Sequence, residues 1–107
     1  MIDPGHGGID PGAVSKRSKK REKDIVLRFS RVFAEELRKT GRYDVHLTRD
    51  TDTFLTLRDR VRFARDKKAH LFIAIHADSV RRGNAQGATV YTLSDNCLLY
   101  TSDAADE

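Results

Sequence analysis

Cysteine, tryptophan and proline are scarce in this sequence, whose 107 residues include one cysteine, no tryptophan and two prolines. The single cysteine, Cys97, cannot form a disulfide within the chain, and it does not identify the redox compartment. No apolar run approaches the roughly 20 residues of a transmembrane helix, so we expect no membrane span. The HExxH motif is also missing, which excludes the helix-borne zinc site of many proteases.

The charge of the sequence is concentrated in one segment. The net charge is +4, but residues 16–23 (KRSKKREK) hold six basic side chains and one acidic one, which leaves the remainder close to neutral. No aromatic residue interrupts the basic run, and the rest of the chain is not basic, so we expect no nucleic-acid partner. The segment is either a solvated loop or a local contact for an anionic polymer.

Hydrophobic periodicity predicts an α/β fold. The apolar pair at residues 1–2 leads into a glycine-rich loop over 4–15, which is typical of the end of a strand that begins further upstream. The other predicted elements are a helix over 22–40 closed by Gly41, a strand over 43–48, a helix from an N-cap at Thr56 to about 68, and strands over 71–75 and 87–93. Because strands alternate with helices, we predict a mainly parallel sheet flanked by helices, with right-handed crossovers.

Two of these elements carry a prediction about burial. The first helix repeats apolar residues at spacings of three and four, which predicts one buried face made of Ile25, Val26, Phe29, Val32, Phe33 and Leu37. The run at 71–75 (LFIAI) is almost continuously apolar, which is typical of a strand buried on both faces.

Three potential metal ligands converge on one edge of the predicted sheet. His6 follows the first strand and His76 follows the strand at 71–75, so parallel strands place both histidines at their carboxyl ends, where sites gather in such sheets. Glu22 begins the next helix, and helices that return over the sheet start at that same edge. Two imidazoles and one carboxylate suit Zn²⁺ and leave a fourth position for water, as in catalytic sites.

Each of these residues also has an ordinary structural interpretation. His6 fits a turn residue in a glycine-rich loop, and Glu22 among basic residues fits a surface ion pair of little energetic weight. His76 fits a strand-end histidine that is hydrogen-bonded to the backbone. Spacing alone leaves these alternatives open.

Four short motifs favour the metal site over these structural interpretations. They are residues 3–8 (DPGHGG), 22–24 (EKD), 47–50 (LTRD) and 72–78 (FIAIHAD). In this order and at this approximate spacing they resemble the motifs of the zinc-dependent N-acetylmuramoyl-L-alanine amidase family, over residues 1 to about 94. Each motif is weak alone, whereas the ordered set of four is specific.

The resemblance implies a zinc-dependent enzyme of the bacterial cell envelope. Such an enzyme hydrolyses the amide between N-acetylmuramic acid and L-alanine in peptidoglycan, and acts in the periplasm or outside the cell. His6, Glu22 and His76 match the family's zinc ligands. The implied partner is the peptidoglycan substrate, and we expect a monomer, although nothing in the sequence fixes the oligomeric state.

The resemblance also implies a second, catalytic glutamate far downstream, which this chain does not match. Glu107 is the only glutamate after Glu36, and it lies in a segment unlike the family. We therefore expect residues 1–95 to be the N-terminal part of an incomplete three-layer amidase domain, and 96–107 to be a non-native or disordered tail. The alternatives are a catalytically inactive, peptidoglycan-binding zinc module, or a zinc hydrolase that acts on another amide.

Four more residues are weighed near this edge of the sheet. Arg49 and Asp50 follow the predicted strand at 43–48, where they either contact substrate or form a structural ion pair, and Arg60 on the second helix fits the structural role. Asp78 either orients His76 through a hydrogen bond or caps a loop.

Overall fold

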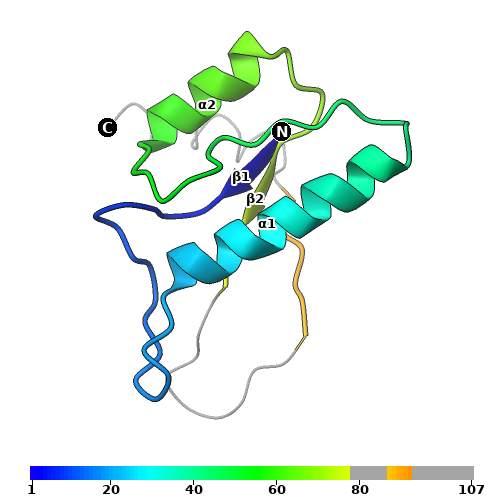
Figure 1. Ribbon diagram of the computed structural model, residues 1–107. Helices are drawn as coiled ribbons and strands as arrows, with labels where there is room; N and C mark the ends of the chain where they lie inside the picture. Colours follow the sequence, from blue (N-terminus) through cyan, green and yellow to red (C-terminus); the bar gives the residue numbers. More distant parts are fainter. Residues whose placement is uncertain (78–86, 93–107) are drawn as a thin grey trace.

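The structure is a computed structural model that describes residues 1–77 and 87–92 (Figure 1). Its regular elements, in chain order, are β1 (Ile2–Pro4), α1 (Glu22–Lys39), α2 (Leu57–Asp66) and β2 (Ile73–Ile75). In Figure 1 the two strands run between the two helices, and the long loop ahead of α1 projects from the end at which both strands leave the sheet. No helix of the described part is long and apolar enough to cross a membrane.

The sheet is parallel, as predicted. Ile2 is paired with Ile73 and Pro4 with Ile75. Backbone hydrogen bonds continue the pairing past both ends of β1, from Ile73 N–H to Met1 O at 2.9 Å and from Gly5 N–H to Ile75 O at 3.0 Å. The residues that follow Pro4 and Ile75 therefore lie next to each other, which is the condition for a shared site.

The strand predicted at 43–48 is wrong as a regular element, although the segment lies where that strand would be. It forms a single parallel bridge, between Leu47 and Ile2. Ile2 N–H donates to His46 O at 2.8 Å, and Thr48 N–H donates to Ile2 O at 3.0 Å. The next residue of β1 on this side is Pro4, which has no N–H to donate, so the ladder cannot continue.

The buried face predicted for α1 is confirmed for Val26, Phe33 and Leu37 and wrong for its other residues. Val26, Leu27, Ser30 and Ala34 are buried, whereas Ile25, Phe29 and Val32 are 45%, 56% and 58% exposed. The small side chains of Ser30 and Ala34 let the helix approach β1 closely, and Ala34 joins Ile2 and Val45 in the core. Helical spacing allowed two apolar stripes on α1, and packing against β1 selected the one with the smaller residues.

The burial predicted for residues 71–75 is also wrong. Only Ile73–Ile75 is a strand, its residues are intermediate or exposed, and Leu71 and Phe72 are exposed. Within the described residues, β1 is the only strand paired with β2, and Ile75 is the only β2 residue that packs against the buried core cluster. Within 87–93, the described residues 87–92 form no strand, and Val90 and Tyr91 are exposed.

The helix ends follow the sequence signals. Gly41 has a φ of 69° and donates its N–H to Arg38 O at 3.0 Å, which closes α1. Thr56 caps α2 in a reciprocal capping box with Asp59. Both predictions are confirmed, because these motifs depend on residues only three or four positions apart.

Candidate metal centre

Three side chains from distant parts of the chain meet beyond the carboxyl ends of the two strands. His6 follows β1, His76 follows β2, and Glu22 is the first residue of α1. One potential ligand atom from each of them lies within 4.8 Å of the other two. His6 Nε2 is 3.0 Å from Glu22 Oε2, and His76 Nδ1 is 3.3 Å from the same oxygen. The structure thus brings together the three residues that the sequence singled out.

The donor set and its spacing suit a small divalent ion. Ligands 2.0–2.2 Å from a tetrahedral zinc ion lie roughly 3.3–3.6 Å from one another. The contacts of 3.0 and 3.3 Å on Glu22 are close to that edge length. The two imidazole rings meet at 88° with centroids 5.2 Å apart, so each ring turns a different edge toward the carboxylate. His76 is half-exposed, which leaves an open side for a further ligand.

Asp10 belongs to the site, although sequence analysis did not identify it. Its Oδ2 lies 2.8 Å from His6 Nδ1, and His6 Nε2 faces Glu22. Its other oxygen accepts from Gly12 N–H at 3.1 Å. A carboxylate on the far nitrogen of a ligand histidine fixes the tautomer and the ring orientation. The signal in the sequence was an aspartate four residues after a histidine, within one glycine-rich loop.

The Glu22 carboxylate is held in its ionised form. Burial raises its pKa, but the backbone N–H groups of Ala13 and Ala77 and the adjacent His6 and His76 rings lower it by more, so the pKa lies below its usual value. The two backbone bonds measure 3.1 Å to Oε1 and 3.0 Å to Oε2. At neutral pH, Glu22 therefore presents a fixed negative charge to the two histidines.

Two glycines allow the ligands to approach the backbone this closely. A Cβ atom at Gly5 would lie 2.5 Å from His76 Cε1, and one at Gly12 would lie 2.7 Å from His6 Cδ2 and 2.8 Å from Glu22 Cβ. Gly12 also has a φ of 69°, which disfavours other residues. The glycine-rich loop is therefore shaped around the three ligands.

Arg49 anchors the loop that carries His6. Its side chain is only 4% exposed, and its guanidinium donates to the carbonyls of Pro4, Gly5, Lys23 and Thr51 at 2.8–3.1 Å. These contacts connect the end of β1, the first turn of α1 and the segment after residue 48. They support a structural role for Arg49, and Asp50 forms its ion pair with Arg31 at 2.7 Å instead.

A second buried arginine holds the same loop from α2. Arg60 Nη1 donates to Asp3 Oδ1 at 2.8 Å and to Pro4 O at 2.7 Å, and Arg60 Nη2 donates to His6 O at 2.8 Å. Both members of the Arg60–Asp3 pair have side chains that are 6% exposed. The backbone of the candidate ligand His6 is thereby fixed by a helix more than fifty positions away.

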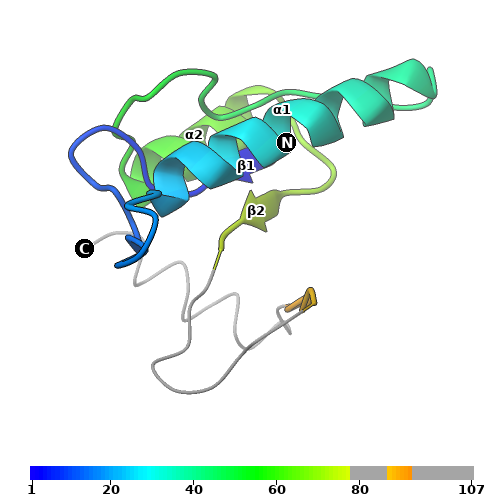
Figure 2. The same cartoon turned by 60° about the horizontal axis from the view of Figure 1, so that its bottom comes forward.

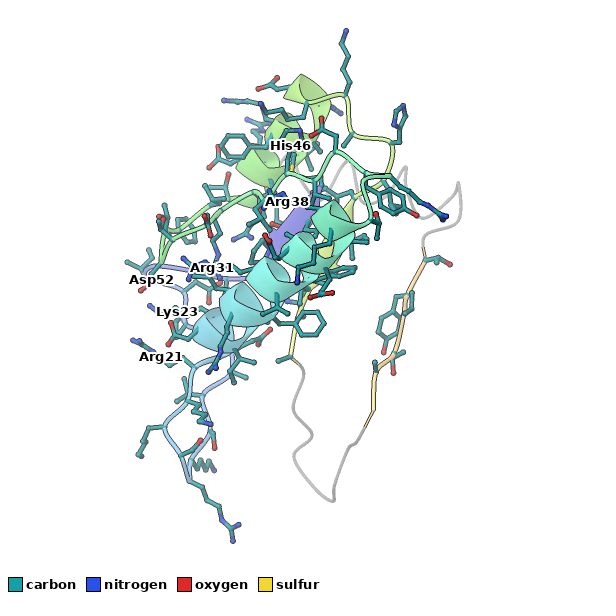
Figure 3. All side chains as sticks on the ribbon, turned by 45° about the vertical axis from the view of Figure 1, so that its right-hand side comes forward. Arg21, Lys23, Arg31, Arg38, His46 and Asp52 are labelled. Atoms are coloured by element: carbon teal, nitrogen blue, oxygen red, sulfur yellow. The ribbon has the colours of Figure 1, made fainter. Side chains whose placement is uncertain are left out.

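Lys23 completes this arrangement at the start of α1. Its Nζ donates to Gly8 O at 2.9 Å and to Asp52 Oδ2 at 2.8 Å, while Asp52 Oδ1 accepts from Gly8 N–H at 2.7 Å. Figure 3 shows Lys23 and Asp52 side by side at this end of the helix. The remaining sequence candidate, Asp78, lies outside the described residues, as do residues 96–107.

Comparison with known proteins places the chain in a family. The family model described as N-acetylmuramoyl-L-alanine amidase matches residues 1–106. The sequence is 45% identical over 94 residues to N-acetylmuramoyl-L-alanine amidase AmiC of Escherichia coli O6:H1, an alignment covering 88% of this chain and 22% of AmiC. It is 45% identical over 95 residues to AmiA of Escherichia coli K12, covering 89% of this chain and 32% of AmiA.

The solved structures that this chain resembles are also N-acetylmuramoyl-L-alanine amidases. The N-acetylmuramoyl-L-alanine amidase of Clostridium difficile 630 matches with a TM-score of 0.74 and 38% identity, over 79% of this chain and 46% of that one. The catalytic domain of CwlV from Bacillus (Paenibacillus) polymyxa var. colistinus matches with a TM-score of 0.72 and 41% identity, over 76% and 45%. The chain thus spans a third or less of the curated relatives and less than half of the solved chains. With its parallel sheet, its flanking helices and this sequence match, the chain belongs to the N-acetylmuramoyl-L-alanine amidase family.

Proposed function

We propose that this chain is part of a zinc-dependent enzyme that hydrolyses the amide between N-acetylmuramic acid and L-alanine in peptidoglycan. The observation that carries the proposal is the convergence of His6, Glu22 and His76 at the sheet edge of a chain from the amidase family. Such an enzyme works in the cell envelope, on the periplasmic or outer side of the membrane, where peptidoglycan is found. Two imidazoles and one ionised carboxylate would hold Zn²⁺.

Different residues of this chain would bind the zinc ion, orient its ligands and support the loop that carries them. When bound, zinc lowers the pKa of a coordinated water to about 7 and polarises an amide carbonyl. Asp10 accepts a hydrogen bond from His6 Nδ1, which would leave the Nε2 lone pair free for the metal. Arg49 and Arg60 keep the His6 loop against β1. The half-exposed His76 marks the side from which a substrate amide would approach.

Among the described residues, no second glutamate lies near the candidate ligands to act as a general acid or base. Besides Glu22, the described glutamates are Glu35 and Glu36, which are exposed in the last turns of α1, away from the three-ligand cluster. Protonating an amine leaving group needs a donor, and general acid–base catalysis contributes typically 10²–10⁴-fold. This observation supports a second candidate function for the chain by itself, as a zinc-holding module that binds peptidoglycan without cleaving it.

Cleavage of purified peptidoglycan separates these candidates. An amidase releases peptides with new N-terminal L-alanine and creates no new reducing sugar ends. We expect the whole enzyme of which this chain is part to release such peptides, to lose this activity in a chelator and to regain it with added zinc, whereas this chain by itself should be nearly inactive. Zinc-dependent binding of peptidoglycan without new alanine termini would support the binding module, and cleavage that survives chelation would contradict the zinc mechanism.

Asp10→Asn is expected to weaken zinc binding by about 10- to 100-fold, the usual effect of losing a carboxylate behind a ligand histidine. The asparagine keeps the size of the side chain but removes the charge that orients the His6 ring. Competition with a chelator of known affinity measures the change, and the ¹⁵N shifts of His6 report its tautomer.

The matched control is Asp44→Asn, which removes the carboxylate from the other aspartate–histidine contact, between Asp44 and His46 at 3.2 Å. Because that pair lies outside the cluster, zinc affinity should be unchanged. Equal affinities for Asp10→Asn and the parent protein would show that Asp10 does not support the centre.

A further inference from the structure

The basic segment ahead of α1 forms a defined hairpin. Val14 and Arg21 form an antiparallel bridge, Ser15 N–H donates to Lys20 O at 2.9 Å, and Lys19 N–H donates to Ser15 O at 2.9 Å. At its base, Glu22 N–H donates to Ala13 O at 2.7 Å. Figure 2 shows this loop folded beside the first turn of α1. Its cations are therefore tied to the backbone of a candidate metal ligand.

Most of the cations in this hairpin have no acidic partner. Arg21 pairs with Asp24 at 2.8 Å, and the buried Lys23 pairs with Asp52. Within residues 1–77 and 87–92, no carboxylate pairs with Lys16, Arg17, Lys19 or Lys20, all of which are exposed. Clustered like charges repel one another, and a bound anion relieves that repulsion.

Two of these unpaired cations, Lys19 and Lys20, line an open hollow between the hairpin and α1, together with Arg21 and with Arg28 of α1. The hollow has a volume of about 540 Å³, and its walls are Lys19, Lys20, Arg21, Asp24, Ile25 and Arg28. Its one acid, Asp24, is already paired with Arg21. The side chain of Arg21 lies at the N-terminal end of α1 in Figure 3, and this residue directly precedes Glu22, with Cα atoms about 3.8 Å apart.

We propose that this hollow binds carboxylate groups on the stem peptides of peptidoglycan. The proposal rests on the proposed function, because Arg21 directly precedes the candidate ligand Glu22, so a peptidoglycan strand at the metal centre would lie near this hollow. Stem peptides carry free carboxylates on the same molecule as the amide to be cut. Lys19, Lys20 and Arg28 supply the positive charge, and exposed Ile25 supplies an apolar floor for the peptide.

Binding to insoluble peptidoglycan sacculi tests the proposal. The probe is sacculi stripped of phosphate-containing polymers, compared with the same sacculi after chemical amidation of their carboxylates. The variant is Lys19→Gln, Lys20→Gln, Arg28→Gln, which leaves the backbone hydrogen bonds of the hairpin in place. We expect about tenfold weaker binding, from three exposed ion pairs. Amidation should weaken binding of the parent protein to the same degree and should not weaken the variant further.

The matched control removes three exposed cations from α2 and its end, through Arg62→Gln, Arg65→Gln and Lys67→Gln. It should bind like the parent protein. If both triple variants lost sacculus binding equally, the weaker binding would follow from the lower net charge alone, and the proposal would be overturned. Full binding of amidated sacculi would overturn it too, as would binding only to sacculi that retain phosphate polymers.

The outcome can be read separately from the proposed function. Binding is measured in a chelator, so it does not depend on zinc or on amide cleavage. Failure of the proposed function appears as missing zinc-dependent release of alanine-terminated peptides. If the hollow does not bind stem-peptide carboxylates, the Lys19→Gln, Lys20→Gln, Arg28→Gln variant will bind sacculi as the parent protein does.

Discussion

Replacing His6 and His76 together by alanine is expected to reduce bound zinc from about one ion per chain to none. The double change leaves only Glu22 of the three ligand atoms that lie within 4.8 Å of one another. A single carboxylate cannot hold a small divalent ion against water at low free-metal concentration. Elemental analysis of protein that was equilibrated with zinc and then passed through a desalting column measures the stoichiometry.

The chain offers a matched control, because its other two histidines, His46 and His70, lie outside the cluster. The variant His46→Ala, His70→Ala should keep the zinc content of the parent protein. Zinc retained by the His6, His76 variant would place the metal elsewhere. No zinc in the parent protein would mean that the convergence of these side chains does not produce a metal site.

Arg60→Ala is expected to lower the free energy of unfolding by roughly 3–5 kcal/mol, the usual cost of removing one partner of a buried ion pair. Arg60 is 5% exposed and bonds to Asp3, Pro4, His6 and Leu55. Without it, Asp3 keeps the Thr48 hydroxyl at 2.6 Å but loses its counter-charge. Because small domains are stable by only about 5–15 kcal/mol, this change removes a large fraction of the stability.

Urea unfolding followed by circular dichroism measures this effect as a shift in the midpoint. Arg62→Ala, an exposed position two residues along α2, is the control and should stay within about 0.5 kcal/mol of the parent protein. Arg60→Lys should fall between the two, because a lysine keeps the charge but cannot reach all four oxygens. Equal midpoints for Arg60→Ala and Arg62→Ala would show that the buried pair contributes nothing.

The sequence by itself determined the features that depend on near neighbours or on chain order. The N-cap at Thr56 and the helix end at Gly41 depend on residues three or four positions apart, and both formed as predicted. The position of His6, Glu22 and His76 followed from element order, since parallel strands end at one edge. A family resemblance in four ordered motifs then matched the comparison with known amidases.

Only the tertiary structure decided which surfaces are buried and which side chains support the centre. Helical spacing could not distinguish the two apolar stripes of α1, and the stripe with Ser30 and Ala34 was chosen by contact with β1. The missing N–H of Pro4 stopped the pairing of residues 43–48 after one bridge. Arg49 and Arg60 gained their roles through hydrogen bonds whose partners, such as His6 for Arg60, are known only once the chain has folded. Local signals are encoded within a few residues, whereas burial and long-range hydrogen bonds depend on partners that are far apart in the sequence.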